Sequence, residues 1–293
     1  MITVPQAFLE DTDTLKILRD GLNCMIDKKA KAPNPNNDRY ITAHALTIVQ
    51  SGSLSITKND GYSETVNQGE MVFLPKGLYM VSDIIPKNKP FRATVYFFEE
   101  KLIHNFINSF EYLIKNRPKI EKFWIVSQMN SVKVFNDHLL ELYGNHNPAN
   151  NRLTKNKLQE LLHLVATSDE GPTFLGLLNH LKNRGKVNIS QFMEQNFDKP
   201  LNIEDYANLT GRSPSTFYRD FKRKFGVSPQ KWLIQKRMEK AKVHLSSNHE
   251  KTVTEVAFNS GYENISHFIK TFKKHFGISP KQYQMRVRES MSV

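Results

Sequence analysis

The chain has 293 residues, of which 39% are apolar and 24% are charged, a balance typical of a globular protein with room for two domains. No apolar run approaches the roughly 18 residues of a membrane span, and the first residues lack the pattern of a secretion signal, so neither a membrane protein nor a secreted one is expected. The formal net charge is +12; residues 186–293 hold 19 Lys and Arg against 10 Asp and Glu, or +9, while residues 1–185 hold 22 against 19, or +3. Such clustered positive charge indicates nucleic acid or an anionic membrane surface as a partner.

The first 98 residues change from a predicted helix to a series of predicted strands. A short helix is expected around Asp13–Asp27, and the polar stretch 28–37 is expected to be a loop. Cys24, the only cysteine, cannot form an internal disulfide, which fits a reducing cytosol; we expect it to be a small buried side chain. β-Branched and aromatic residues then predict five strands, at Ala43–Val49, Leu54–Thr57, Met71–Leu74, Met80–Ile84 and Arg92–Phe98. Short strands at this spacing predict a small barrel or sandwich.

One segment between these strands resembles a known motif. Residues 69–77, Gly-Glu-Met-Val-Phe-Leu-Pro-Lys-Gly, resemble the second motif of the cupin barrel. In metal-binding cupins a histidine follows three residues later, whereas this chain has Met80, and the first cupin motif with its His-x-His has no match. His44 stands alone, and a metal needs several convergent ligands. We therefore expect a cupin-like barrel without metal or cofactor, in which His44 is a hydrogen-bonded or exposed histidine.

Helical periodicity begins at Glu99. Apolar stripes predict four helices, marked by Leu102/Phe106/Phe110/Leu113, Val134/Leu139/Leu140/Tyr143, Leu158/Leu161/Leu162/Val165 and Phe174/Leu175/Leu178/Leu181. Most of these stripes must pack on the barrel or on each other, and one is a candidate dimer seam. The pattern breaks at residues 183–186, where we place the boundary between an N-terminal domain, residues 1–184, and a C-terminal domain, residues 185–293.

The C-terminal domain contains the same pattern twice. Phe217, Phe221 and Phe225 recur every four residues before Gly226, and Phe268, Phe272 and Phe276 do so before Gly277. Each copy is predicted to be the second helix of a helix-turn-helix, at 214–225 and 264–276. Each is preceded by a shorter helix that an N-cap opens: Asn202, followed by Glu204 and Asp205, in the first copy, and a Thr252/Glu255 capping box in the second.

A long helix is predicted between the two copies, from Ser228-Pro229 to about Leu245. Its length of roughly 26 Å, with the packing of each unit added, can set two recognition helices near the 34 Å repeat of one DNA turn. The fold class predicted for the chain is therefore α+β, with an N-terminal cupin-like barrel and flanking helices followed by an all-α domain with two helix-turn-helix units.

The phenylalanine stripes determine which side chains the two recognition helices expose. The first helix exposes Ser215, Tyr218, Arg219 and Lys222, which a helix in a major groove presents to base edges, and Lys222 or Arg223 can neutralise a phosphate. The second helix exposes Ile265, Ser266, Ile269, Lys270 and Lys273. Arg219 can donate two hydrogen bonds to guanine. Ile265 and Ile269 either touch thymine methyl groups or complete the local core. The alternative for the basic residues is a solvated face without a ligand.

At these residues the chain resembles the AraC/XylS family of bacterial transcription regulators. The second copy carries the resemblance most plainly, in Val256-Ala257, Gly261-Tyr262, Ser266, Phe268, Phe272-Lys273-Lys274, Phe276-Gly277, Ser279-Pro280 and Tyr283. The resemblance implies two helix-turn-helix units in successive major grooves of an asymmetric site. Gln284 departs from the family, which usually has Arg after the aromatic residue, so one structural or phosphate contact is in question.

The N-terminal domain is similar to the family's sensor and dimerisation module. The run Lys157–Leu162, with Gly171-Pro172 and Asn183-Arg184, resembles the activators of type III secretion genes, which answer to protein partners. The resemblance implies a cytoplasmic, nucleoid-associated bacterial activator that binds promoter DNA and RNA polymerase, forms a homodimer, and senses a small molecule or a regulatory protein. Tyr79, Met80 and Tyr96 are the candidate ligand-binding residues. The alternatives are a metal-dependent cupin-type enzyme, which the missing motif disfavours, and a partner-binding protein that ignores DNA.

Overall fold

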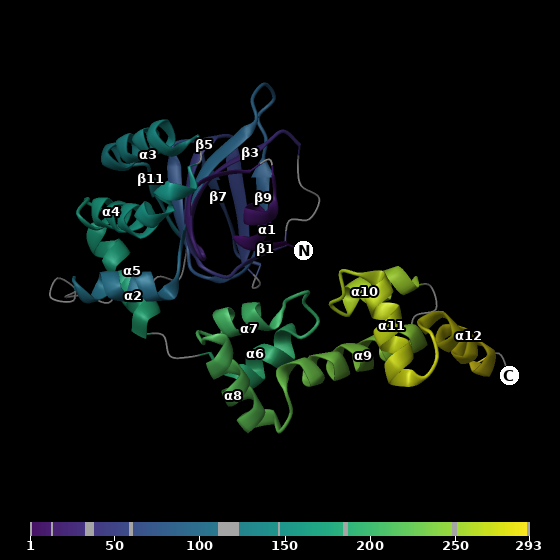
Figure 1. The fold of residues 1–293 in the computed structure, drawn as a ribbon. Coiled ribbons are helices and arrows are strands. Elements are labelled where there is room, and N and C mark those ends of the chain that lie inside the picture. The colour runs from purple at the N-terminus through teal and green to yellow at the C-terminus, as the bar shows by residue number, and fades with distance from the viewer. Residues whose placement is uncertain are drawn as a thin grey trace. The chain divides into compact units, whose positions relative to one another are not determined.

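The chain divides into two compact units, residues 1–185 and 186–293. The computed structural model describes residues 2–12, 14–32, 38–58, 61–110, 123–145, 147–183, 187–247 and 251–291. The first unit combines strands with helices, and the second has helices but no strands among its described residues (Figure 1). The predicted α+β class is confirmed.

Two sheets form the core of the first unit. The five-stranded sheet has the order β1-β4-β9-β6-β7, made of Ile2–Val4, Asp38–Ile41, Gly77–Ile84, Ser53–Lys58 and Ser63–Asn67. The six-stranded sheet has the order β11-β8-β5-β10-β3-β2, made of Trp124–Ser127, Glu70–Leu74, His44–Ser51, Phe91–Phe98, Asn23–Ala30 and Leu15–Asp20. All of these pairs are antiparallel except β1 with β4.

The six-stranded sheet is buried on both faces. In β10, Phe91, Ala93, Val95 and Phe97 point into the apolar core between the two sheets. The alternate residues Tyr96 and Phe98 belong to a second core that includes the helices of this unit. The two cores follow from the period of two in a strand, which sends successive side chains to opposite faces. Cys24 lies in the core between the sheets and is fully buried, as predicted.

The helix predicted around Asp13–Asp27 is wrong, because the chain there forms β2 and β3 with a turn at Gly21 (φ 66°). The loop predicted for 28–37 is wrong in its first part, because β3 continues through Lys28, Lys29 and Ala30. Both strands pair with each other, and β3 also pairs with β10, some 65 residues away. Partners so distant in sequence override local preference, because strand stability depends on cross-strand packing. The five predicted strands are confirmed, with ends that differ by a few residues.

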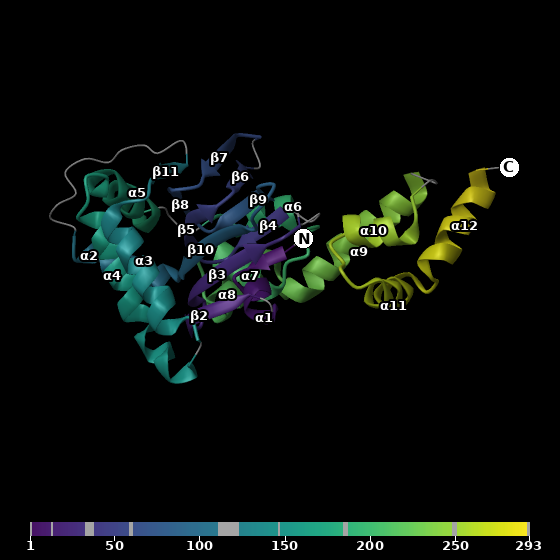
Figure 2. The ribbon, with the colours of Figure 1, turned by 90° about the horizontal axis from the view of Figure 1, so that it is seen from above.

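The helices of the first unit gather beside the six-stranded sheet (Figure 2). They are α2 (Glu100–Asn108), α3 (Asn130–Tyr143), α4 (Thr154–Ala166) and α5 (Gly171–Asn183), with a 3-10 turn at Pro148–Leu153. The short α1 (Gln6–Glu10) instead packs against the core between the two sheets. Leu113 lies outside the described residues. Val134 was predicted to face inward on α3, which is wrong, because it is 46% exposed; Leu139 of the same stripe is buried as predicted, together with Val132 and Phe135. The reason is that α3 turns Asn136 inward, where its Oδ1 accepts a hydrogen bond from the Tyr96 hydroxyl at 2.6 Å.

The second unit consists of two helical groups joined by one long helix (Figure 1). The elements are α6 (Ile189–Asn196), α7 (Ile203–Leu209), α8 (Pro214–Phe225), α9 (Pro229–Ser247), α10 (Val253–Asn259), α11 (Ile265–Phe276) and α12 (Pro280–Met291). The predicted helices and caps of this region are confirmed. Within the described residues, no helix combines the length and apolar character that crossing a bilayer would need.

Candidate nucleic-acid interface

Helix α8 begins and ends where its capping residues dictate. The Ser213 hydroxyl accepts a hydrogen bond from the Thr216 N–H at 3.3 Å, and Pro214 occupies the first turn. Gly226 adopts the left-handed conformation (φ 71°), which ends the helix at little steric cost. Phe217 and Phe221 are fully buried. This burial sets the rotation of α8 about its axis.

The outer face of α8 presents the residues predicted to contact DNA. Ser215, Tyr218, Arg219, Lys222 and Arg223 are all exposed. The Tyr218 hydroxyl donates a hydrogen bond to the Gln230 side chain in the first turn of α9, at 3.1 Å. Gln230 is itself exposed and was not predicted. Its signal in the sequence is weak, because an exposed polar residue in the first turn of a helix is common.

Asp220 distinguishes the two exposed arginines of α8. Its carboxylate accepts hydrogen bonds from Arg212 and from Arg223, each at 3.2 Å. The hydrogen bond from Arg212 holds the pKa of Asp220 below its ordinary value, and the charges of Arg223, Arg212 and Arg219 add to this effect. The Arg219 guanidinium lies 3.9 Å from the same carboxylate and its side chain is 73% exposed. Arg219 is therefore the arginine of α8 that is held less closely by Asp220.

Helix α11 repeats the design of α8. The Asn264 side chain accepts a hydrogen bond from the His267 N–H at 2.9 Å, Gly277 (φ 81°) ends the helix, and Phe268 and Phe272 are fully buried. The exposed face carries Ser266, Ile269, Lys270 and Lys273, and also His267 and Lys274, which were not predicted.

The sequence allows two roles for the isoleucines of α11, which are contact with thymine methyl groups or a part in the local core. Ile269 is 37% exposed and Ile265 is partly exposed. Neither belongs to the apolar cluster that α9, α10 and α11 form around Phe268 and Phe272. This position favours a role at the surface over one in the core.

Helix α9 contributes to the cores of both helical groups. Near its start, Trp232 packs on Phe225 and Phe221 of α8, with ring centroids 5.2 and 5.8 Å apart. Near its end, Met238, Ala241 and Leu245 belong to the cluster around Phe268 and Phe272. With 19 residues, the helix is about 28 Å long. One rigid element thus carries both recognition helices.

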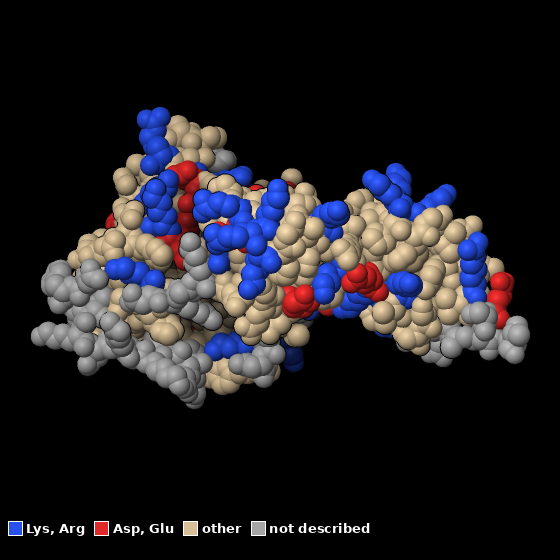
Figure 3. All heavy atoms as spheres, turned by 90° about the horizontal axis from the view of Figure 1, so that it is seen from below, with Lys and Arg blue, Asp and Glu red and all other residues tan. Residues whose placement is uncertain are grey.

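Basic side chains are prominent on the face of this unit shown in Figure 3. Gln284, which stands where the resemblance leads one to expect arginine, is not among the exposed residues. It is 3% exposed, and its side chain donates a hydrogen bond to the Lys251 carbonyl at 3.0 Å. Gln284 therefore has a structural role, tying α12 to the residues that precede α10.

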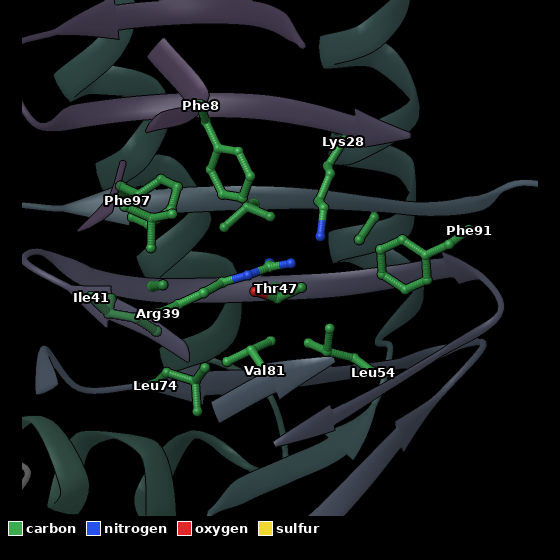
Figure 4. Close-up of a pocket in the computed structure, with 14 residues that line it drawn as sticks. Phe8, Lys28, Arg39, Ile41, Thr47, Leu54, Leu74, Val81, Phe91 and Phe97 are labelled. Carbon is green, nitrogen blue, oxygen red and sulfur yellow. The ribbon is translucent and has the colours of Figure 1, made fainter. Parts of the chain in front are cut away.

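The first unit contains a small cavity between its two sheets (Figure 4). Its volume is about 30 Å³, and apolar side chains surround the amino group of Lys28 and the guanidinium of Arg39. Asp83 pairs with both, at 2.5 Å from the Lys28 Nζ and 3.2 Å from Arg39. Burial, and to a smaller extent the charge of Arg39, lower the pKa of Lys28 to about 7 against the opposing effect of Asp83.

The structure separates the three candidate ligand residues. Tyr79 lies in the core between the sheets, where its hydroxyl donates a hydrogen bond to the Pro75 carbonyl at 2.8 Å. Met80 points outward and is 49% exposed. Tyr96 faces the helices and is bonded to Asn136. None of these three residues lines the cavity. Its lining includes Lys28, Arg39 and Phe8 instead.

His44 is buried and stacks on Phe73, with ring centroids 6.0 Å apart. Its Nδ1 accepts a hydrogen bond from the Lys76 N–H at 3.3 Å. Burial, together with the smaller effects of the charges of Lys76 and His104, lowers the pKa of His44 to about 3. Across the described residues, no three His, Cys, Asp or Glu side chains gather in a way that could hold a metal ion.

Two protein-family descriptions match the chain. Residues 206–286, which contain α8, α9, α10 and α11, match the helix-turn-helix domain, and residues 44–177 match the ExsA N-terminal regulatory domain. The chain belongs to the AraC/XylS family of transcription regulators. It is thus a DNA-binding regulator whose N-terminal unit is similar to the regulatory domain of ExsA.

Relatives of this AraC-type regulator match along most of its length. The thermoregulatory protein LcrF of Yersinia pestis is 26% identical over 246 residues, which are 82% of this chain and 88% of LcrF. The regulator ExsA of Pseudomonas aeruginosa is 27% identical over 243 residues, which are 80% of this chain and 84% of ExsA. Among solved structures, an apo variant of ToxT from Vibrio cholerae covers 92% of this chain and 98% of its own, at 12% identity and a TM-score of 0.46.

Proposed function

We propose that this regulator activates transcription by placing α8 and α11 in two successive major grooves of an asymmetric promoter site. The observation that carries the proposal is the duplication: each helix buries a phenylalanine stripe, and each exposes polar and basic residues on the opposite face. An exposed helix face of this kind is what a major groove accepts. Yersinia relatives with 26% identity are described as transcriptional activators, which supports activation as the direction of control.

The roles proposed for individual residues follow from exposure and chemistry. Base edges are assigned to the exposed polar or apolar side chains at the centre and start of each helix, namely Ser215, Tyr218, Arg219, Ile265, Ser266, Ile269 and Lys270. Ile265 and Ile269 are suited to thymine methyl groups, which are the apolar feature of the major groove. Phosphates are assigned to Lys222, Arg223 and Lys273, because a phosphate contact needs charge and reach more than a defined orientation.

A mobility shift with the full-length protein tests this proposal. Duplexes enriched by the protein from a randomised pool should be bound at least about a thousandfold more tightly than scrambled duplexes of equal length. Protection of two major-groove segments one helical turn apart would support the use of both recognition helices. Failure to enrich any sequence would overturn the proposal and favour a protein that uses its basic unit without reading DNA.

We also propose that the first unit forms a homodimer through α3 and α4. A groove of about 420 Å³ runs between these helices, and it is lined by Ser131, Val134, Phe135, His138, Leu139, Leu142, Tyr143, Lys157, Glu160 and Leu164. Leu142 is 67% exposed and Val134 is 46% exposed, so apolar surface on α3 is left uncovered in the single chain. A second copy of the same surface can cover it by two-fold symmetry.

We infer that a regulatory protein, rather than a small molecule, controls this activity. A cavity of about 30 Å³ has room for one or two water molecules, whereas small-molecule sites usually have several hundred Å³. Contact with RNA polymerase in the bacterial cytoplasm is the proposed route to activation. Native mass spectrometry of protein purified gently from its source cell tests the inference: a protein partner or a bare dimer supports it, and a bound mass of a few hundred daltons contradicts it.

A further inference from the structure

The two helix-turn-helix groups of the second unit meet at one arginine of α9. The Arg237 guanidinium donates hydrogen bonds to three carbonyls of the segment between α6 and α7: to Phe197 at 2.7 Å, Lys199 at 2.6 Å and Leu201 at 3.2 Å. These carbonyls lie beyond the end of α6 and before the start of α7, where helix hydrogen bonding does not use them. Arg237 therefore satisfies the backbone of the first group from the shared helix.

The same side chain also contacts the second group. The Arg237 Cζ lies 5.8 Å from the ring centroid of Tyr262, in the turn between α10 and α11. A Cβ added to the preceding Gly261 would lie 2.9 Å from the Arg237 Nε and 2.9 Å from the Asp198 carbonyl oxygen. Gly261 also has a φ of 85°. The turn before the second recognition helix is thus pressed against both Arg237 and the backbone of the first group.

We propose that Arg237 is a positioning residue that sets the separation and relative rotation of α8 and α11, and so the spacing of the two DNA segments that the protein accepts. The inference rests on the proposed function of those helices. Helix α9 alone would hold its two ends at a set distance but would leave each group attached along one side only. The node formed by Arg237, Gly261, Tyr262 and the 197–201 segment adds a direct contact between the groups.

The chemistry of the node requires arginine. A guanidinium offers five N–H donors in a planar fork, so one side chain reaches three carbonyls and still stacks on an aromatic ring. Lysine keeps the charge but has a single ammonium group, which cannot reach all three carbonyls together. Arg237→Lys therefore removes the hydrogen bonds that position the two groups while it keeps the positive charge. Lys236→Met is the matched control, because Lys236 is the adjacent residue and its ion pair, at 3.1 Å with Glu194, stays within the first group.

A distance measurement tests the proposal without DNA. Spin labels at Lys224→Cys and Lys274→Cys, both exposed positions near the ends of α8 and α11, report the separation of the helices in the full chain. Cys24 does not compete for the label, because it is buried and burial raises the pKa of its thiol. A narrow distance distribution is expected for the parent protein and for Lys236→Met, and a broader one for Arg237→Lys. A broad distribution already in the parent protein would overturn the proposal, whatever the variants do.

A DNA measurement tests the consequence for spacing. Into a duplex enriched by the parent protein, one base pair is inserted between the two protected segments, which rotates one segment by about 34° relative to the other. The parent protein and Lys236→Met should lose at least about tenfold in affinity, whereas Arg237→Lys should lose less than about threefold from a weaker starting value. An equal spacing penalty in folded Arg237→Lys would refute the proposal. If the parent protein enriches no duplex, the proposed function fails instead, and the distance measurement still decides the role of Arg237.

Discussion

The carboxylate of Asp220 determines how freely each neighbouring arginine can contact DNA. On α8, Asp220 holds Arg212 and Arg223 at 3.2 Å and leaves Arg219 at 3.9 Å. An arginine committed to a carboxylate presents fewer free donors to a base. We therefore expect the two exposed arginines, which lie four positions apart, to contribute differently to recognition.

Arg219→Ala should weaken binding to the enriched duplex by about 1–3 kcal/mol and relax the base preference at one position, because a bidentate contact to guanine is lost. Arg223→Ala is the matched control and should weaken all sequences alike. Competition binding against duplexes with each base at each position measures both effects. Unchanged affinity and preference in Arg219→Ala would remove it from the base-reading residues.

The capping boxes of the two helical groups place their carboxylates in different surroundings. Burial, and to a smaller extent Glu204 and Glu263, raise the pKa of Asp205 to about 6 against the opposing hydrogen bond from the Asn202 N–H. Glu255, at the equivalent position of the second group, is exposed, and the hydrogen bonds from Thr252 lower its pKa. The folded state therefore favours the protonated form of Asp205 and the ionised form of Glu255. Their contributions to stability have opposite signs as the pH changes.

Stability of the second unit should accordingly fall as pH rises from about 4 to about 6 through Asp205. Asp205→Asn should remove this dependence and stabilise the unit at pH 7 by about 1–3 kcal/mol. Glu255→Gln should instead remove stability that is present above about pH 4.5 and lost as pH falls below it. Urea unfolding followed by Trp232 fluorescence, in a Trp124→Phe background, measures each change. A pH profile that Asp205→Asn leaves unaltered would contradict the assignment.

At the scale of elements, α3 combines a buried face with an exposed apolar one. Leu142→Asp should dissociate the proposed dimer, because it places a charge in an apolar contact surface. The adjacent Glu141 is exposed and does not line the groove, so Glu141→Lys is a matched control that should remain dimeric. Sedimentation equilibrium measures the outcome. A dimer that survives Leu142→Asp with unchanged affinity would exclude this face as the seam.

Element boundaries were predictable where the signals are local. The caps Ser213, Asn264 and Thr252 and the left-handed glycines 226 and 277 lie within a few residues of the helix ends that they determine. Strands β2 and β3 carry no such signal and resembled a helix in sequence. Strand β7 (Ser63–Asn67) was not predicted either, because its sequence is mostly polar and only Val66 is buried. β2 pairs with β3, β3 also pairs with β10, and β7 pairs with β6. These partners are visible only in the folded sheet.

At the scale of the whole molecule, the charge of the second unit should make DNA binding strongly salt-dependent. If Lys222, Arg223 and Lys273 neutralise three phosphates, log Kd should rise with log salt at a slope of about 3 for each chain bound to its two-segment site. Lys222→Ala should lower this slope by about 1. Binding isotherms on the enriched duplex from 50 to about 300 mM salt measure the slopes. A slope unaffected by Lys222→Ala would mean that this residue contacts no phosphate.

The sequence by itself determined the class of the protein and the architecture of its second unit. The phenylalanine repeats, caps and glycines act over one or two helical turns, so the helix faces and helix ends that they specify do not depend on distant residues. Tertiary structure alone decided which residues surround the barrel cavity, that Met80 and Tyr96 point away from it, and that Gln284 is buried. It also brought Arg237 together with Gly261 and the 197–201 segment. The physical reason is that these contacts join residues far apart in the chain. A change of one residue in strand register also reverses the direction of a side chain, and a change of one position on a helix turns it by about 100°.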